Sequence, residues 1–122
     1  MERYVLQAEK EIVEEIFEVN STSSSLFEPS FNVFPGSPMP IIYHDSIREI
    51  KSGVWGISAG DKKVTTFTKQ EVEEDSIKKF DLKPCLIPAS GFYLWKQSVD
   101  DKYPFYIRML GREVLGLAGL FH

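Results

Sequence analysis

The longest apolar and aromatic run of the chain, residues 84–96, constrains the fold more than any other feature. It reads PCLIPASGFYLWK and has charged segments on both sides. From Gly91 onward its aromatic residues favour a buried β-strand. Pro88 and Gly91 fit a bend or bulge at the start of that strand, because proline lacks the ladder N–H and glycine accepts unusual dihedrals. The run therefore predicts a β core.

Further strand-like runs surround this core. Two of them, residues 103–110 and 113–121, follow the run closely, so we expect the three to form a meander. Earlier apolar or β-branched runs predict short strands at residues 3–6, 31–36, 39–43, 47–57 and 64–68. The strand at residues 31–36 should end in a Pro-Gly turn.

Two segments are predicted to be helices. In residues 8–19, Ala8, Ile12 and Ile16 share one face, joined by Val13 and Phe17 at the neighbouring positions, and glutamates cover the rest. Residues 70–80 begin with acidic side chains and end with lysines, which complements the helix dipole. We therefore expect an α+β fold, mainly β, with a curved or barrel-like antiparallel sheet and two peripheral helices.

Composition indicates a globular chain. The 122 residues fit one domain, and 43% hydrophobic with 13% aromatic residues can form a packed core. A single cysteine excludes a disulfide within the chain and fits a reducing compartment. No signal-peptide pattern and no run of about 18 apolar residues is visible, so we expect a soluble, cytoplasmic protein.

Charge is unevenly distributed. The net charge is −4. Residues 1–47 hold two basic and eight acidic side chains, whereas residues 48–122 hold twelve basic and ten acidic ones. The acidic total argues against tight non-specific binding to nucleic acid, which depends on phosphate neutralisation. The second part of the chain could still present a local basic face.

Motifs for nucleotides and metals are absent from the sequence. There is no glycine-rich phosphate loop, and Cys85, His44 and His122 lack a metal-ligand spacing, so we expect no cofactor and no metal. We interpret Cys85 as a small buried hydrophobe rather than a nucleophile. Trp55 and Trp95 could stack on bases, but large aromatic residues in strands more often belong to the core.

Five segments resemble, in order, the signature of the SOS-response-associated peptidase (SRAP) family. Residues 84–96 are similar to the family pattern R-C-[LI]-[VI]-P-A-x-G-[FW]-[YF]-E-W-K. The other segments are FNVFPG at 31–36, VWGI at 54–57, YPFYI at 103–107 and LAGLF at 117–121. The resemblance spans essentially the whole chain but only the first half to two-thirds of the family domain. It implies one SRAP-like domain, residues 1–122, that lacks the carboxy-terminal part of the family domain.

The resemblance implies a DNA-damage function. Members of the family bind single-stranded DNA and sense abasic sites in the SOS response. Their amino-terminal cysteine, exposed after methionine removal, closes a thiazolidine ring on the sugar aldehyde. An Asn in an N-A-R strand, the Glu of the F-Y-E-W-K strand and a later His assist. The same cysteine is assigned the autocatalytic removal of short leader residues.

The groups that carry this chemistry are replaced here. Glu2 stands in place of the Cys-Gly pair, Leu94 in place of the Glu, and Thr65 and Phe67 in place of the Asn and Arg of N-A-R. A carboxylate cannot form a thiazolidine, and leucine cannot transfer a proton. The family His belongs to the missing part, and His122 does not match its motif.

Three interpretations follow. The chain is a degenerate SRAP-like domain that serves as a binding or interaction module, a family enzyme with altered chemistry on single-stranded or abasic DNA, or a fragment without activity. The joint loss of four groups favours the first. The candidate DNA-binding or cleft residues are Arg3, Asn32, Trp55, Phe67, Lys96 and Arg108. The alternative is that the basic side chains among them simply occupy exposed strand positions and bind nothing.

The carboxy-terminal strand predicts self-association. Without the strands that complete the family barrel, Leu115, Leu117, Leu120 and Phe121 would leave an apolar edge exposed. We therefore expect a homodimer through the carboxy-terminal strands. The alternative is that the helix at residues 8–19 covers this edge within one chain.

Overall fold

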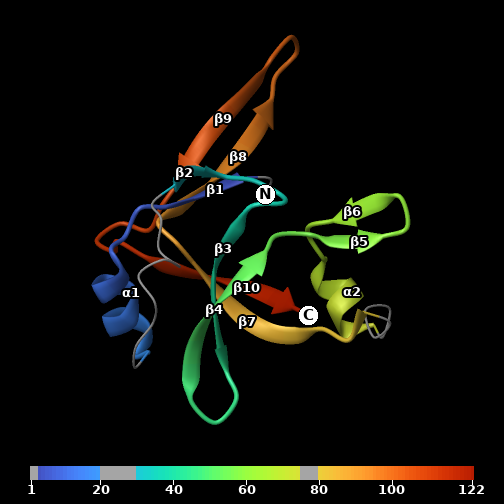
Figure 1. Ribbon diagram of the computed structural model, residues 1–122. Helices are drawn as coiled ribbons and strands as arrows, with labels where there is room; N and C mark the ends of the chain where they lie inside the picture. Colours follow the sequence, from blue (N-terminus) through green and yellow to red (C-terminus); the bar gives the residue numbers. More distant parts are fainter. Residues whose placement is uncertain (1–2, 20–29, 75–79) are drawn as a thin grey trace.

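The computed structural model describes residues 3–19, 30–74 and 80–122. These residues form two four-stranded antiparallel sheets, a two-stranded hairpin and two helices (Figure 1). The prediction of an α+β fold that is mainly β is confirmed. Within the described residues neither sheet closes on itself, so the fold is not a closed barrel.

The first sheet has the strand order β2-β1-β8-β9. Its strands are β1 (Arg3–Leu6), β2 (Ser30–Val33), β8 (Gly91–Gln97) and β9 (Lys102–Ile107). In Figure 1 the β8–β9 hairpin extends well beyond the two shorter strands. Its outer part therefore has no layer packed against it, and every residue of β9 is exposed.

The second sheet has the strand order β10-β7-β3-β4. Its strands are β3 (Pro38–His44), β4 (Arg48–Val54), β7 (Lys83–Ala89) and β10 (Leu115–Phe121). Strands β7 and β8 meet at Ser90, whose N–H donates to the Val5 carbonyl at 2.7 Å. The run at residues 84–96 thus forms two strands, one in each sheet, and Pro88 lies inside β7 rather than before the strand.

The predicted meander is wrong, because β10 pairs with β7 instead of β9. The β10–β7 pairing runs from Leu115 opposite Ala89 to Phe121 opposite Lys83. A Cβ at Gly119 would lie 2.7 Å from Ile87 Cδ1 and 3.1 Å from Cys85 Sγ. Glycine at this position leaves room for the side chains of Ile87 and Cys85 on the facing strand.

Shorter elements complete the fold. Strands β5 (Ile57–Ala59) and β6 (Lys62–Val64) form a hairpin, so the predicted strand at 64–68 is wrong beyond Val64. Helix α2 (Lys69–Glu73) begins at a capping box of Thr68 and Glu71 and ends at Glu74, which is extended. This helix is shorter than the predicted helix at residues 70–80. Residues 75–79 of that prediction lie outside the described residues.

Helix α1 (Lys10–Phe17) covers one face of the second sheet. Val13 is fully buried there, in a cluster with Val19, Ile42, Ile50 and Val114. Burying such side chains contributes about 1.5–3 kcal/mol each. Val13 belongs to the cluster and Ala8, Ile12 and Phe17 pack against it, as predicted, but Ile16 is 44% exposed.

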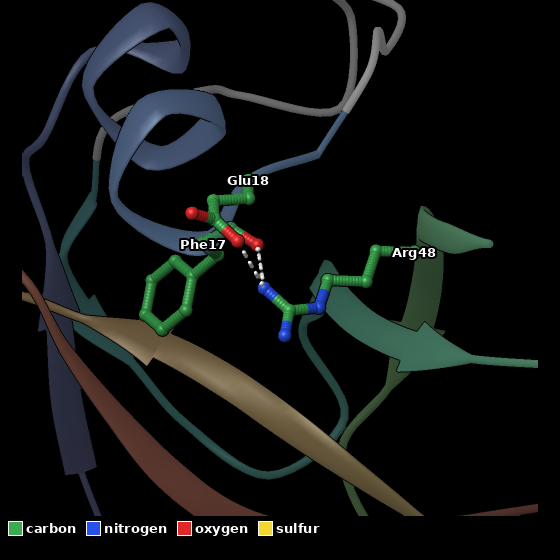
Figure 2. Close-up of polar contacts among 3 residues, drawn as sticks. All are labelled: Phe17, Glu18 and Arg48. Atoms are coloured by element: carbon green, nitrogen blue, oxygen red, sulfur yellow. Dashed lines mark hydrogen bonds and ion pairs between the residues drawn. The ribbon is translucent and has the colours of Figure 1, made fainter.

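A basic side chain holds the end of α1 against the second sheet. Arg48 Nη1 donates to the Phe17 carbonyl at 2.8 Å and lies 3.4 Å from Glu18 Oε2 (Figure 2). The last carbonyls of a helix lack partners within the helix, and a cation at this end also complements the helix dipole. The contact therefore ties α1 to the start of β4.

The apolar side chains of β10 are partly covered within the chain. Leu115 and Leu117 pack against a core cluster of Tyr4, Leu6, Val33 and Ala89 that joins the two sheets. The Phe121 ring lies 5.2 Å from the Tyr43 ring. In the described sheet, however, β10 is an edge strand, so one side of its backbone has no strand partner.

Candidate functional site

A row of side chains crosses the side of the first sheet that faces away from the core. In the strand register Arg3 lies opposite Tyr93, and Tyr93 lies opposite Tyr106. Directly opposed residues of antiparallel strands project to the same face. Arg3 Nη1 donates to Asn32 Oδ1 at 3.0 Å, which extends the row to β2. We call Asn32, Arg3, Tyr93, Tyr106 and the neighbouring Trp95 the outer face.

The outer face combines one cation, Arg3, with several aromatic rings. The Tyr93 and Tyr106 rings lie 5.4 Å apart, and the Arg3 guanidinium lies 5.4 Å from the Phe34 ring. Tyr106 is 46% and Trp95 44% exposed. Exposed rings can stack on nucleobases, and an arginine among them can contact phosphate or stack as well. The prediction that Trp95 belongs to the core is wrong, because the hairpin extends past the core.

The opposite side of the β8–β9 hairpin carries other residues. Leu94 lies opposite Phe105, and Lys96 lies opposite Tyr103. These pairs are displaced by one residue from the Tyr93–Tyr106 pair, so their side chains project to the other side of the hairpin. All four are exposed. Lys96 is therefore not brought together with Arg3 and Asn32. Leu94, at the position of the family glutamate, offers no polar atom, and Glu2 lies outside the described residues.

Trp55 and Phe67 line a cavity of about 1190 Å³ on the face of the second sheet that α1 does not cover. Trp55 Nε1 donates to the Thr65 carbonyl at 3.1 Å, and its ring lies 5.6 Å from that of Tyr4. Trp55 also packs against the core cluster, which confirms its core role. The Phe67 ring lies 5.9 Å from that of Phe80. The ring-to-ring contacts make this a mainly apolar space.

The titratable side chains among the described residues that line this cavity are those of Tyr4, Lys51, Lys69, Cys85 and His122. The pKa of Lys51 is raised, and the main cause is a hydrogen bond with Tyr43. The Lys51 Nζ lies 4.4 Å from the centroid of the Tyr43 ring. Burial raises the pKa of the Tyr4 phenol, so Tyr4 stays neutral. Neither group is suited to act as a base near neutral pH.

Cys85 is buried in β7, as predicted. Burial raises the pKa of its thiol to about 11. The thiolate is the nucleophilic form, so this cysteine is inert near neutral pH. In residues 3–19, 30–74 and 80–122, no three His, Cys, Asp or Glu side chains cluster as a metal site would require. The same ranges contain no helix long and apolar enough to cross a membrane.

The structure divides the six predicted site residues among four places. Arg3 and Asn32 lie together on the outer face, and Trp55 and Phe67 lie at the cavity. Lys96 is on the other side of the hairpin, and Arg108 lines a small cleft beyond β9. Sequence reasoning missed Tyr93 and Tyr106. Each lies in a segment that the sequence predicts to be a strand, but their alignment with Arg3 depends on pairing between distant strands.

The fold and the sequence match known proteins. A family model described as SOS response associated peptidase (SRAP) matches residues 2–122. Abasic site processing protein YobE of Bacillus subtilis (strain 168) is 28% identical over 106 residues, which cover 78% of this chain and 48% of YobE.

Two solved structures share the fold. A phage-related protein from Bordetella bronchiseptica superposes with a TM-score of 0.79 at 23% identity, over 98% of this chain and 60% of that one. A protein from Bacteroides thetaiotaomicron gives a TM-score of 0.71 at 17% identity, over 98% and 59%. The chain thus spans about half the length of the curated relative and about 60% of the two solved chains. Because the family model covers nearly the whole sequence, this chain belongs to the SRAP family.

Proposed function

We propose that this SRAP-family chain binds single-stranded DNA non-covalently through the outer face and acts as a binding module in the response to DNA damage. The row of Arg3, Tyr93 and Tyr106 across three strands carries this proposal. The name of its relative YobE, an abasic site processing protein, supports abasic DNA as the context. A cytoplasmic location follows from the same role.

The module lacks the crosslinking and autopeptidase chemistry of the family. Its one cysteine is buried, and the position of the family glutamate holds Leu94. On the outer face the Arg3 side chain is engaged with Asn32 rather than with a carboxylate that could transfer protons. The second interpretation, an enzyme with altered chemistry, would require a general acid or base beside Arg3.

Binding should be dominated by stacking. Stacking of a base on an aromatic side chain contributes about 1–3 kcal/mol, whichever base it is. The outer face offers one guanidinium, that of Arg3, among several rings. Because few phosphates are contacted, the affinity should depend only weakly on salt. For single strands, each phosphate contact lowers the slope of log binding constant against log salt concentration by about 0.7.

The Trp95→Ala variant tests the proposal. We expect its affinity for a labelled ten-nucleotide oligothymidine, measured by fluorescence anisotropy, to fall about tenfold, as the loss of one stacked base predicts. Phe105→Ala is the matched control, because Phe105 is 50% exposed on the other side of the same hairpin. Equal losses in the two variants, or none in Trp95→Ala, would contradict an outer-face site.

We further propose that two copies associate through β10. It is an edge strand among the described residues and carries no charged side chain, although edge strands usually do. Light scattering at several concentrations should give a mass that rises from about 14.0 kDa toward twice that value. Leu117→Lys should keep the mass at the monomer value. A monomer at all concentrations would rule out this association.

A further inference from the structure

A second, smaller cleft lies at the end of the first sheet that is farther from Arg3. Its volume is about 450 Å³, and it lies between the start of the β1–α1 connection, the bend at Ser90 and the turn after β9. The polar residues that line it are Gln7, Ser90, Tyr106, Arg108, Arg112 and Glu113. Tyr106 belongs to both the cleft and the outer face, so the two surfaces are continuous.

The backbone fixes the walls of this cleft. The Gln7 N–H donates to Ser90 Oγ at 2.8 Å, which joins two segments that are distant in the sequence. After β9, the Arg112 N–H donates to the Met109 carbonyl at 3.3 Å. Gly111 has a φ of 74° at the third position of this turn, where a type II turn needs glycine. The tight turn returns the chain so that Arg108 and Arg112 line the same cleft.

Three residues that line the cleft carry side-chain donors without an acceptor among the described residues, namely Gln7, which is partly buried, and the exposed Arg108 and Arg112. Gln7 Nε2 is buried and has no hydrogen-bond partner among the described residues. A buried polar group without a partner is rare and points to an absent water, ion or ligand. Arg108 and Arg112 form no ion pair with any residue in the described ranges. Glu113 is the one carboxylate among the lining residues, so the two guanidinium groups leave a net positive charge.

We propose that this cleft binds a phosphate group, and that in the working protein the phosphate belongs to a DNA strand lying along the outer face. A phosphate presents only acceptors, and the planar fork of arginine matches its oxygens in bidentate fashion. Gln7 lies four residues beyond Arg3 along β1 and its continuation, about 13 Å at the rise of a strand. The assignment to DNA rests on the proposed function, whereas the phosphate site itself does not.

The first experiment uses inorganic phosphate. Nitrogen-15 NMR spectra are recorded during a phosphate titration at constant ionic strength. Shifts should concentrate on the Gln7 side-chain amide, Ser90 and residues 108–113. The double variant Arg108→Gln/Arg112→Gln should weaken binding at least about tenfold, because two charge-assisted contacts are lost. Glu113→Gln should tighten binding about threefold by removing a like charge.

The second experiment uses the ten-nucleotide oligothymidine. Arg108→Gln/Arg112→Gln should weaken its binding about tenfold, as the loss of two phosphate contacts implies. The control Lys62→Gln/Lys69→Gln removes the same charge from exposed positions outside both the cleft and the outer face, and should bind as the wild type does.

The two experiments separate the possible failures. The first outcome is that the chemical-shift changes caused by phosphate spread over the surface or persist in Arg108→Gln/Arg112→Gln. That result would overturn the cleft site even if the oligonucleotide binds. Phosphate binding in the cleft without any oligonucleotide binding would contradict the proposed function and the DNA assignment but leave the phosphate site. The third outcome is that phosphate binds in the cleft but the double variant leaves the oligonucleotide affinity unchanged. That result would overturn the assignment to DNA.

Discussion

Incubation with single-stranded DNA that carries one abasic site is expected to yield no adduct that survives denaturation. A thiazolidine needs a thiol and a free α-amine on neighbouring carbons of one residue, so only an amino-terminal cysteine can form it. The single cysteine of this chain, Cys85, is buried within β7. With a pKa of about 11, only about one thiol in ten thousand is ionised at pH 7.

A denaturing gel measures this outcome directly. A short peptide with an amino-terminal cysteine, incubated with the same DNA, is the positive control because it holds both reacting groups. A native gel run in parallel should show that the protein still binds the strand. A shifted band that survives denaturation would contradict the prediction. Its loss in Cys85→Ser would then identify Cys85 as the reacting group.

Local patterns were sufficient to predict the fold class. The aromatic run after Gly91, the apolar face of α1 and the Pro-Gly turn at residues 35–36 are each recognised from neighbours in the sequence. Strand partners depend instead on packing between distant segments. Strand β10 pairs with β7 and not with β9, its nearer neighbour in the sequence, and no local pattern predicts that choice.

The residues of the candidate site also differ in whether local sequence is enough to select them. Arg3 and Asn32 could be selected from their segments, and the structure joins them by a hydrogen bond. The rings beside Arg3 could not be selected, since Tyr93 and Tyr106 reach it only through the register of three strands. Trp95 was assigned to the core because sequence indicates that a strand is apolar but not that its hairpin extends past the neighbouring layer.

The contact between β8 and β9 at Gly91 predicts a large loss of stability in Gly91→Ala. The added Cβ would lie 2.6 Å from the Ile107 carbonyl oxygen and 2.6 Å from the Tyr106 ring. The oxygen is backbone, so relief requires the two strands to separate where Phe92 pairs with Ile107. Overpacking of this kind costs about 1–3 kcal/mol, and the rigid neighbour places the expected loss at about 3 kcal/mol. That is a large part of the total stability of about 5–15 kcal/mol that is usual for a domain.

Urea denaturation followed by circular dichroism gives the free energy of unfolding for Gly91→Ala and for a matched control. Gly53→Ala is that control, because its Cβ would lie 3.4 Å from Ile41 Cγ2, in nearly ordinary contact. Gly53 lies in β4, and its replacement should change the free energy of unfolding by less than about 1 kcal/mol. Tyr106 also belongs to the outer face and the phosphate cleft, so Gly91→Ala should weaken oligonucleotide binding even where the protein remains folded. A Gly91→Ala protein as stable as Gly53→Ala would show that β8 and β9 are not packed as closely as the contact at Gly91 indicates.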